Sequence, residues 1–256
     1  MNAGSAQGTH SLFISDLHLS EELPDITAAF LEFLAGPACD ATRLYILGDL
    51  FEFWIGDDTL GEGLNLEITR AVRGLVNRGV GVFLMHGNRD FLVSGAFSEA
   101  TGVTLLEDPT LVDLHGTPTL LLHGDTLCTD DQAYQAFRVH VRNPAVQRQF
   151  LDLPVAARRT QVGQARSASE REKQLKPAQI MDVAPATVEA ILRMQGYPRM
   201  IHGHTHRPAR HEHRVDGRLC ERWVLSDWHT GGDYLRVDAA GCTRHPIAPG
   251  TAVSGT

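Results

Sequence analysis

The chain has 256 residues and a mass of 28.1 kDa, which is enough for one large domain with its own hydrophobic core. Its net charge of −8 argues against a general nucleic-acid binder, because such a protein needs a broad basic face. Hydrophobic residues make up 43% and charged residues 21% of the chain, as in ordinary folded domains, so a largely disordered chain is not expected.

The N-terminal residues, the apolar runs and the cysteines together indicate the cellular compartment of the protein. Residues 1–10 lack the basic and apolar regions of a secretory signal, and no apolar run approaches the roughly 18 residues of a membrane span. The four cysteines are far apart and form no CxxC pair, which argues against a zinc knuckle or a disulfide framework. We therefore expect a cytoplasmic protein whose contact with membranes, if it has any, is peripheral.

Short apolar runs recur along the chain, and amphipathic segments separate the first three of them. Five runs are too short for buried helices and rich in aliphatic and aromatic residues, so they predict buried strands at residues 11–15, 43–47, 80–85, 119–122 and 199–201. Residues 26–34 and 64–78 carry apolar side chains on one helical face and predict helices between the first three strands. This alternation predicts an α/β protein.

The pattern after Arg207 predicts antiparallel strands. Residues 221–225 and 234–237 flank the pair Gly231-Gly232, which is typical of a β-hairpin turn. With the preceding strands and helices, this favours a mixed sheet or a two-sheet sandwich flanked by helices.

A basic segment separates the fourth and fifth predicted strands. Residues 133–176 contain nine Arg or Lys residues and three acidic residues, a balance of +6 in an acidic chain. Apolar residues at helical spacing from 134 to 141, and Asn143-Pro144 as a break and restart, predict a helical insertion. Its charges could equally form an ordinary solvated helical face.

Polar residues of one chemical kind follow each of the five predicted strands. They are Asp16 and His18, then Gly48-Asp49, Gly87-Asn88-Arg89-Asp90, His123-Gly124-Asp125 and Gly203-His204-Thr205-His206. Strand ends converge in layered α/β proteins, so these loops are expected to meet. Carboxylate, amide and imidazole ligands without thiolates suit Mn, Fe, Mg or Zn. One such residue alone is more often a turn or cap residue, but five sets after five strands predict a metal centre.

In this order, the motifs resemble the signature of the calcineurin-like metallophosphoesterases, and the match runs from Asp16 to His206. The local sequences at 13–19, 48–57, 87–91, 123–131, 180–183 and 202–208 are similar to the branch that hydrolyses UDP-2,3-diacylglucosamine in bacterial lipid A synthesis. The resemblance implies an αββα sandwich as a single domain over residues 1–256, with a helical lid inserted at 132–178.

The resemblance also implies a ligand set and a reaction. Two Mn²⁺ ions are expected, one held by Asp16, His18, Asp49 and His206 and the other by Asn88, His123 and His204, with Asp49 shared. The implied reaction is hydrolysis of the pyrophosphate bond, giving UMP and 2,3-diacylglucosamine 1-phosphate (lipid X). The expected protein is a monomer bound peripherally to the cytoplasmic face of the inner membrane.

Site roles carried over from the resemblance fall into two groups. The catalytic residues are expected to be Asp49, Asn88, Arg89 and His204, and the substrate contacts Asn88, Arg89, Asp131, Ser169, Lys173, Lys176 and His204. Lys173 stands where a polar amide is expected, although a cation there still suits an anionic ligand. An acylated substrate also requires an apolar groove, for which the candidates are Tyr134, Phe137, Val141, Phe150 and Leu153.

Arg89 carries an argument that is independent of the substrate's name. Most members of the wider superfamily have a histidine after the motif asparagine, and this histidine can protonate an alkoxide leaving group. Arginine stays charged and cannot act as an acid, whereas its planar fork binds phosphate oxygens. Arg89 therefore favours a leaving group that needs no proton, which indicates an anhydride rather than a simple ester.

Two other functions fit parts of the sequence. A metallophosphoesterase acting on a soluble nucleotide, either a cyclic nucleotide or a dinucleoside polyphosphate, would use the same ligands without a lipid-shaped lid. A non-catalytic scaffold of the same fold is less well supported, because such scaffolds lose ligands and every expected ligand position is filled here.

Overall fold

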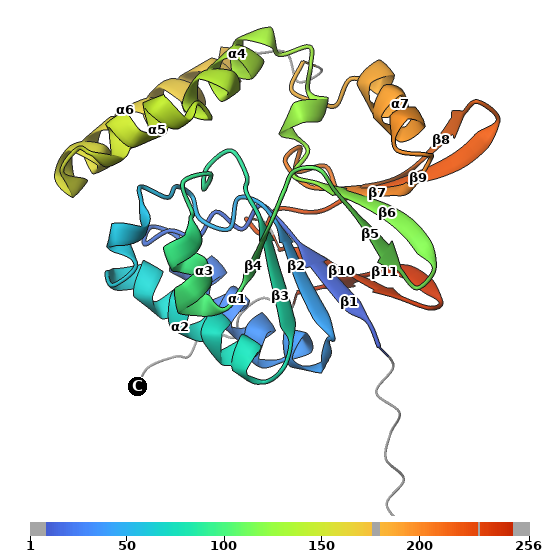
Figure 1. Ribbon diagram of the computed structural model, residues 1–256, viewed down its shortest axis with the longest axis horizontal. Helices are drawn as coiled ribbons and strands as arrows, with labels where there is room; N and C mark the ends of the chain where they lie inside the picture. The colour runs from blue at the N-terminus through green and yellow to red at the C-terminus, as the bar shows by residue number, and fades with distance from the viewer. Residues whose placement is uncertain (1–8, 176–179, 230, 248–256) are drawn as a thin grey trace, which may run out of the picture.

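Two β-sheets form the centre of the protein (Figure 1). The computed structural model describes residues 9–175, 180–229 and 231–247, with side chains in the last inserted helix described as far as Arg166. The first sheet has the order β11-β10-β1-β2-β3-β4 and contains β1 (Ser11–Ile14), β2 (Arg43–Leu47), β3 (Gly81–Met85), β4 (Thr104–Leu106), β10 (Asp233–Asp238) and β11 (Gly241–Pro246). Strands β1 to β4 are parallel, and β10 and β11 are antiparallel additions.

The second sheet has the order β5-β6-β7-β9-β8. Its strands are β5 (Thr110–Leu114), β6 (Thr117–Leu122), β7 (Arg199–His202), β8 (Ala209–Val215) and β9 (Arg218–Val224). Strands β6, β7 and β9 are parallel, whereas β5 and β8 pair antiparallel with their neighbours. The predicted two-sheet sandwich and the five predicted strands are confirmed.

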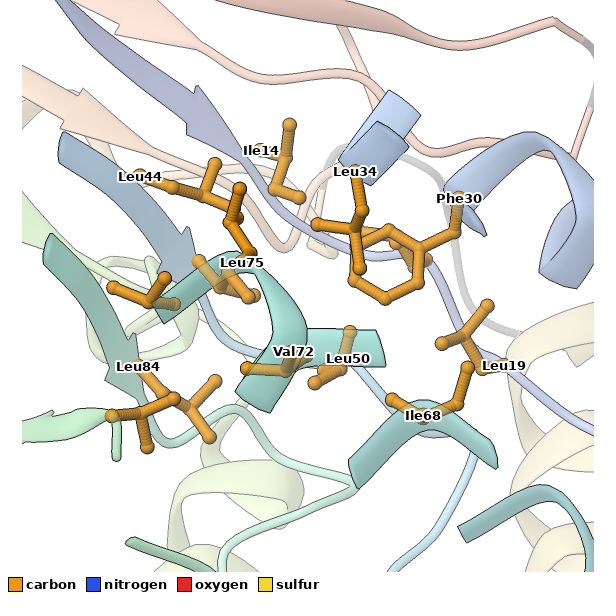
Figure 2. Packing of buried hydrophobic residues seen from close by; sticks show 14 of the residues in the cluster. Ile14, Leu19, Phe30, Leu34, Leu44, Leu50, Ile68, Val72, Leu75 and Leu84 are labelled. Atoms are coloured by element: carbon orange, nitrogen blue, oxygen red, sulfur yellow. The ribbon is translucent and has the colours of Figure 1, made fainter. Parts of the chain in front are cut away.

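Three hydrophobic clusters show how the layers stack. Helices α1 (Pro24–Ala35), α2 (Gly63–Asn77) and α3 (Gly95–Thr101) cover the outer face of the first sheet (Figure 1). In Figure 2, Phe30, Leu34, Ile68, Val72 and Leu75 from α1 and α2 pack against Ile14, Leu44 and Leu84 from the strands. A second cluster, which includes Phe13, Leu47 and Ile201, fills the space between the sheets. Helix α7 (Pro185–Met194) covers the second sheet through Val188 and Leu192. The layers are therefore α, β, β and α.

The predicted hairpin after Arg207 is wrong. Strand β9 pairs with β7 and β8 in the second sheet, while β10 pairs with β1 and β11 in the first. The glycine pair lies in the segment that crosses between the sheets. A Cβ at Gly232 would lie 2.8 Å from the Trp228 indole, so this glycine leaves room for a ring that packs against Phe30 and Phe33. The glycine signal reflects a close approach, not a hairpin turn.

The helical insertion leaves the sandwich between β6 and α7. It consists of α4 (Gln132–Val141), α5 (Pro144–Leu151) and α6 (Val155–Leu175), which Figure 1 shows stacked together outside the two sheets. The predicted break is confirmed, because the Asn143 side chain accepts a hydrogen bond from the Ala145 N–H and Pro144 begins α5. Short 3₁₀ helices η1 (Pro37–Asp40), η2 (Asp57–Thr59) and η3 (Asp125–Leu127) complete the elements. Within the described ranges, no helix combines the length and apolar character needed to cross a bilayer.

Gly74 provides a simple test of the packing on α2. It lies in the helix interior, and a Cβ there would meet no heavy atom within 4 Å. Gly74→Ala is expected to stabilise the protein by roughly 0.5–1 kcal/mol, because alanine loses less backbone freedom on folding. Urea denaturation should show a higher midpoint with an unchanged slope. A lower urea midpoint would mean that a methyl group at position 74 clashes with neighbouring atoms.

Candidate metal centre

The loops that follow β1, β2, β3, β6 and β7 meet at one place. Backbone pairing continues beyond β1 and β2, where the Asp16 N–H donates to Gly48 O at 3.1 Å and the His18 N–H donates to Asp49 O at 3.0 Å. The Gly203 N–H likewise donates to His123 O at 2.8 Å in the second sheet. The two sets of loops are joined by the His204 N–H, which donates to Asp16 Oδ2 at 2.9 Å, so they lie at a common edge, as the sequence predicts.

Two overlapping groups of side chains have a geometry that could hold a metal ion. Asp16, His18 and His206 each offer a ligand atom within 4.8 Å of the others, and so do Asp16, Asp49 and His123. In the first group, His206 Nε2 lies 3.3 Å from His18 Nε2 and 3.4 Å from Asp16 Oδ1.

Asn88 and Asp49 connect the two sides of the site. Asn88 Oδ1 lies 3.1 Å from His123 Nε2 and 2.9 Å from His204 Nδ1. Asp49 Oδ2 lies 3.8 Å from His18 Nε2 and 3.9 Å from His123 Nε2, which places this carboxylate between the two groups. The structure thus brings together all seven residues predicted as ligands.

The backbone at this site is unusual. Asp16, His18, Asp49, His204 and His206 have φ angles between 52° and 67°, in the left-handed region that residues with a Cβ seldom adopt. Backbone strain of this kind persists only where the surrounding structure fixes it, and it concentrates at functional sites. The close approach of the loops supplies that restraint here.

Three imidazoles are oriented by groups outside the ligand set. His18 Nδ1 lies 3.0 Å from Glu52 Oε2, and His206 Nδ1 lies 3.2 Å from Asp227 Oδ2. The remote nitrogen of the third ring, Nδ1 of His123, lies 2.9 Å from the Leu47 carbonyl oxygen. Because Nδ1 of each ring is engaged, Nε2 faces the other candidate ligands. This is the usual arrangement around a metal-binding histidine. Sequence reasoning missed Glu52 and Asp227.

Asp90 organises the loop beneath Asp49. Its carboxylate accepts hydrogen bonds of 2.8 Å from the Gly87 and Leu50 N–H groups. Asp49 Oδ1 in turn accepts a 2.8 Å hydrogen bond from the Arg89 N–H. Asp90 belongs to the predicted motif, but its role in positioning the backbone could not be read from the sequence.

The electrostatics of the site call for a cation. Burial raises the pKa of Asp49. Burial alone would lower the pKa of His123, but the carboxylates of Asp49 and Asp125 outweigh it and raise this pKa to about 9. Asp16 Oδ1 is buried without a hydrogen-bond partner. A divalent cation suits this environment, because buried carboxylates need compensating charge and the imidazole nitrogens become donors once a metal displaces their protons.

The residues predicted to contact substrate are placed unevenly. Arg89 lies at the centre, with Nη1 3.8 Å from Glu52 Oε1 and its side chain 16% exposed. Asp131 caps α4, accepting a 3.0 Å hydrogen bond from the Tyr134 N–H. Ser169 and Lys173 fall within α6, but their side chains, like the whole of Lys176, lie outside the described residues.

Helix α4 is attached to the centre by polar contacts. Asp125, two residues after His123, accepts hydrogen bonds of 2.7 Å from Tyr134 Oη and from Arg138 Nε. The Tyr134 ring lies 5.8 Å from the His204 ring. Arg142 Nη2 donates to the Gly87 carbonyl oxygen at 2.7 Å. The insertion is therefore fixed directly to the loops that carry the ligands.

The residues predicted to line an apolar groove lie in different places. Tyr134, Phe137 and Val141 line a small cavity together with Asn88 and Phe91. Phe150 instead packs against the hydrophobic cluster that covers the outer face of the first sheet.

Comparisons with known proteins show which family the sequence matches. A family model described as calcineurin-like phosphoesterase matches residues 9–208. The chain is 52% identical over 231 residues to a UDP-2,3-diacylglucosamine hydrolase of Aromatoleum aromaticum, covering 90% of this chain and 94% of that one. It is 51% identical over 245 residues to a protein of the same name from Xanthomonas campestris pv. campestris, covering 93% and 99%. Among solved structures, an archaeal phosphodiesterase aligns with a TM-score of 0.46 and 12% identity, covering 93% of this chain and all of that one.

Proposed function

The chain belongs to the calcineurin-like phosphoesterase family, and from this premise we propose that it hydrolyses the pyrophosphate bond of UDP-2,3-diacylglucosamine to give UMP and 2,3-diacylglucosamine 1-phosphate. The convergence of six candidate ligand side chains and Asp49 at one place carries the reaction class. The substrate is supported by two relatives that are named UDP-2,3-diacylglucosamine hydrolase. They are 51–52% identical to this chain, and the match covers 94–99% of their length.

We propose that the site holds two Mn²⁺ ions. Asp16, His18, Asp49 and His206 would hold one, and Asn88, His123 and His204 would hold the other together with Asp49. The similar distances from Asp49 Oδ2 to His18 and His123 support its place in both sets. When bound, a pair of divalent cations supplies an activated water and neutralises charge on the phosphate oxygens.

The protein's own side chains then position the substrate. Arg89 lies beside Asp49, so its fork can bind oxygens of the phosphate that is attacked. The Asn88 amide contacts both His123 and His204 and keeps these imidazoles in place. Because Arg89 cannot donate a proton, the leaving phosphate departs as an anion, which agrees with a pyrophosphate substrate.

We also propose that residues 132–178 act as a lid over the substrate and that the protein, as a monomer, binds peripherally to the inner membrane. The fixed contacts of α4 with the ligand loops support the first part. The second part is supported by the exposure of Phe137 and Val139 on α4, at 52% and 72%, in an insertion whose sequence is basic. Such a combination favours a surface with anionic headgroups.

Turnover of the acylated substrate tests the proposal directly. The Mn-loaded protein should release UMP from UDP-2,3-diacylglucosamine, and it should release far less from UDP-sugars without acyl chains and from bis(p-nitrophenyl) phosphate. If a soluble nucleotide is the better substrate, the metal centre remains but the lipid assignment is wrong.

Metal removal should abolish the reaction. Dialysis against EDTA is expected to stop UMP release, and added Mn²⁺ should restore it, because no side chain at the site can replace the charge of the cations. Elemental analysis of the reloaded protein should give two metal ions per chain. Activity that persists in metal-free protein would contradict the proposed chemistry, and one ion per chain would contradict the paired ligand sets.

Arg89 can be tested separately from the cations. Arg89→Met is expected to lower kcat about 10²- to 10³-fold, the usual cost of losing one group that stabilises developing charge. Metal content should be unchanged, because the Arg89 contact to Asp49 comes from the backbone N–H. The matched control is Arg73→Met on α2, a half-buried arginine outside the site whose side chain donates to the Glu99 carbonyl oxygen. Equal kcat values in the two variants would rule out the proposed role of Arg89.

A further inference from the structure

A pocket of about 260 Å³ opens on the outer face of the second sheet, away from the metal ligands' own side chains. Its lining includes Arg222 of β9, His211 of β8, Thr205 and Arg207 from the loop after β7, and Asp182 from the segment before α7. We call it the Arg222 pocket. Thr205 stands between His204 and His206, so the pocket lies directly behind the ligand loop.

The first unusual feature of the Arg222 pocket is a buried charge. Arg222 is only 6% exposed, and its Nε and Nη1 donate to His213 Nε2 at 3.1 Å and His202 Nε2 at 3.0 Å. A ring nitrogen that accepts a hydrogen bond from a guanidinium N–H carries no proton, so both imidazoles take part in these contacts as neutral groups. They satisfy the guanidinium without compensating its charge.

The acidic residue of the pocket is already engaged. Asp182 forms an ion pair with Arg207, and its other oxygen accepts a 2.8 Å hydrogen bond from the Val183 N–H. Within the part of the chain that the structure describes, no carboxylate forms an ion pair with Arg222. Because an arginine remains protonated and a buried charge is costly unless paired, Arg222 carries a charge that no direct ion pair compensates and that Asp182 offsets only from a distance.

A second feature, independent of the first, also indicates a ligand. The Thr205 hydroxyl oxygen is buried and has no hydrogen-bond partner, although Thr205 lines the same pocket. A buried hydroxyl without a partner costs about 1–3 kcal/mol. An acceptor in the pocket would satisfy this hydroxyl together with the guanidinium.

We propose that the Arg222 pocket binds an oxyanion, either inorganic phosphate or the phosphate group of a nucleotide, held by the Arg222 guanidinium and the Thr205 hydroxyl. Phosphate suits the site because a guanidinium fork binds two of its oxygens while a hydroxyl donates to a third. The ligand would brace the loop that carries His204 and His206 from the side opposite the metals. The proposal does not depend on the identity of the acylated substrate.

Equilibrium dialysis of the Mn-loaded protein with labelled inorganic phosphate tests the site. The wild type should bind two phosphates per chain, one at the metal centre and one in the Arg222 pocket. Thr205→Val keeps the shape of the side chain. This variant and Arg222→Gln should each weaken binding of the pocket phosphate tenfold or more. Asp49→Asn should remove the other phosphate and leave the pocket phosphate bound, which separates the two sites.

Two results would overturn the proposal. One is a single phosphate in the wild type, lost in Asp49→Asn. The other is two bound phosphates whose affinities change in neither Thr205→Val nor Arg222→Gln.

The source of the oxyanion follows from competition with UMP and with uridine. Displacement of the pocket phosphate by UMP but not by uridine supports a nucleotide phosphate, and displacement by neither supports free phosphate.

Discussion

Replacing Asp49 with asparagine is expected to abolish UMP release and metal binding together. Asparagine keeps the shape of the side chain and an oxygen for the Arg89 N–H, but it removes the charge between His18 and His123. The loss of rate should be on the order of 10³-fold or more, because metal catalysis supplies several kcal/mol and each 1.4 kcal/mol corresponds to a factor of ten. Steady-state kinetics and elemental analysis of the same preparation measure both effects.

The matched control is Asp238→Asn. Asp238 is the last residue of β10 and lies beside the start of β1, whereas the ligand loops follow the ends of the parallel strands. Its side chain pairs with Arg236 at the surface. This variant should keep full activity and full metal content. If Asp49→Asn retained both ions and normal turnover, Asp49 could not be the residue that the two ligand sets share.

Most of the sandwich could be predicted because its signals are local. Residues 43–47 form β2, and the predicted helix over 64–78 corresponds to α2 with a shift of one residue. The apolar periodicity in these segments reflects burial on one face, which does not depend on distant partners. Strand order and the sheet to which each strand belongs depend on contacts between distant residues. The hairpin after Arg207 was wrong for this reason, since a pair of glycines looks the same in a turn and beneath the Trp228 ring.

The convergence of the candidate ligands could be predicted, but the groups that orient them could not. Asp16, Asn88 and His204 directly follow strands, so the topology of the sheets places them. Glu52 reaches His18 only because of the loop after β2, and Asp227 reaches His206 only because the chain crosses between the sheets. The error over the hairpin therefore also concealed Asp227. A carboxylate three residues after Asp49 was the one signal in the sequence that could have identified Glu52.

Gly87 is the position where the backbone loops of the site approach most closely. A Cβ there would lie 2.0 Å from Asp49 Oδ1 and 2.3 Å from Asp49 N, distances at which something must move. The atoms met are backbone and a buried carboxylate, so no flexible side chain can yield. The Gly87 N–H is also bonded to Asp90, and its carbonyl oxygen is bonded to Arg142 of the insertion. Any displacement of Gly87 must therefore shift Asp49, the Asp90 loop or α4.

Gly87→Ala is accordingly expected to destabilise the protein by about 1–3 kcal/mol, as overpacking of a filled interior does. It should also lower kcat at least about 10²-fold, because a shift of 1 Å in a positioned group has that cost. Gly74→Ala makes the same chemical change where a Cβ meets nothing, so it should leave activity unchanged. Urea denaturation and UMP release, measured on both variants, separate the local clash from the general effect of adding a methyl group. A Gly87→Ala protein as active as Gly74→Ala would show that the loops around Asp49 have room to relax, contrary to the packing described above.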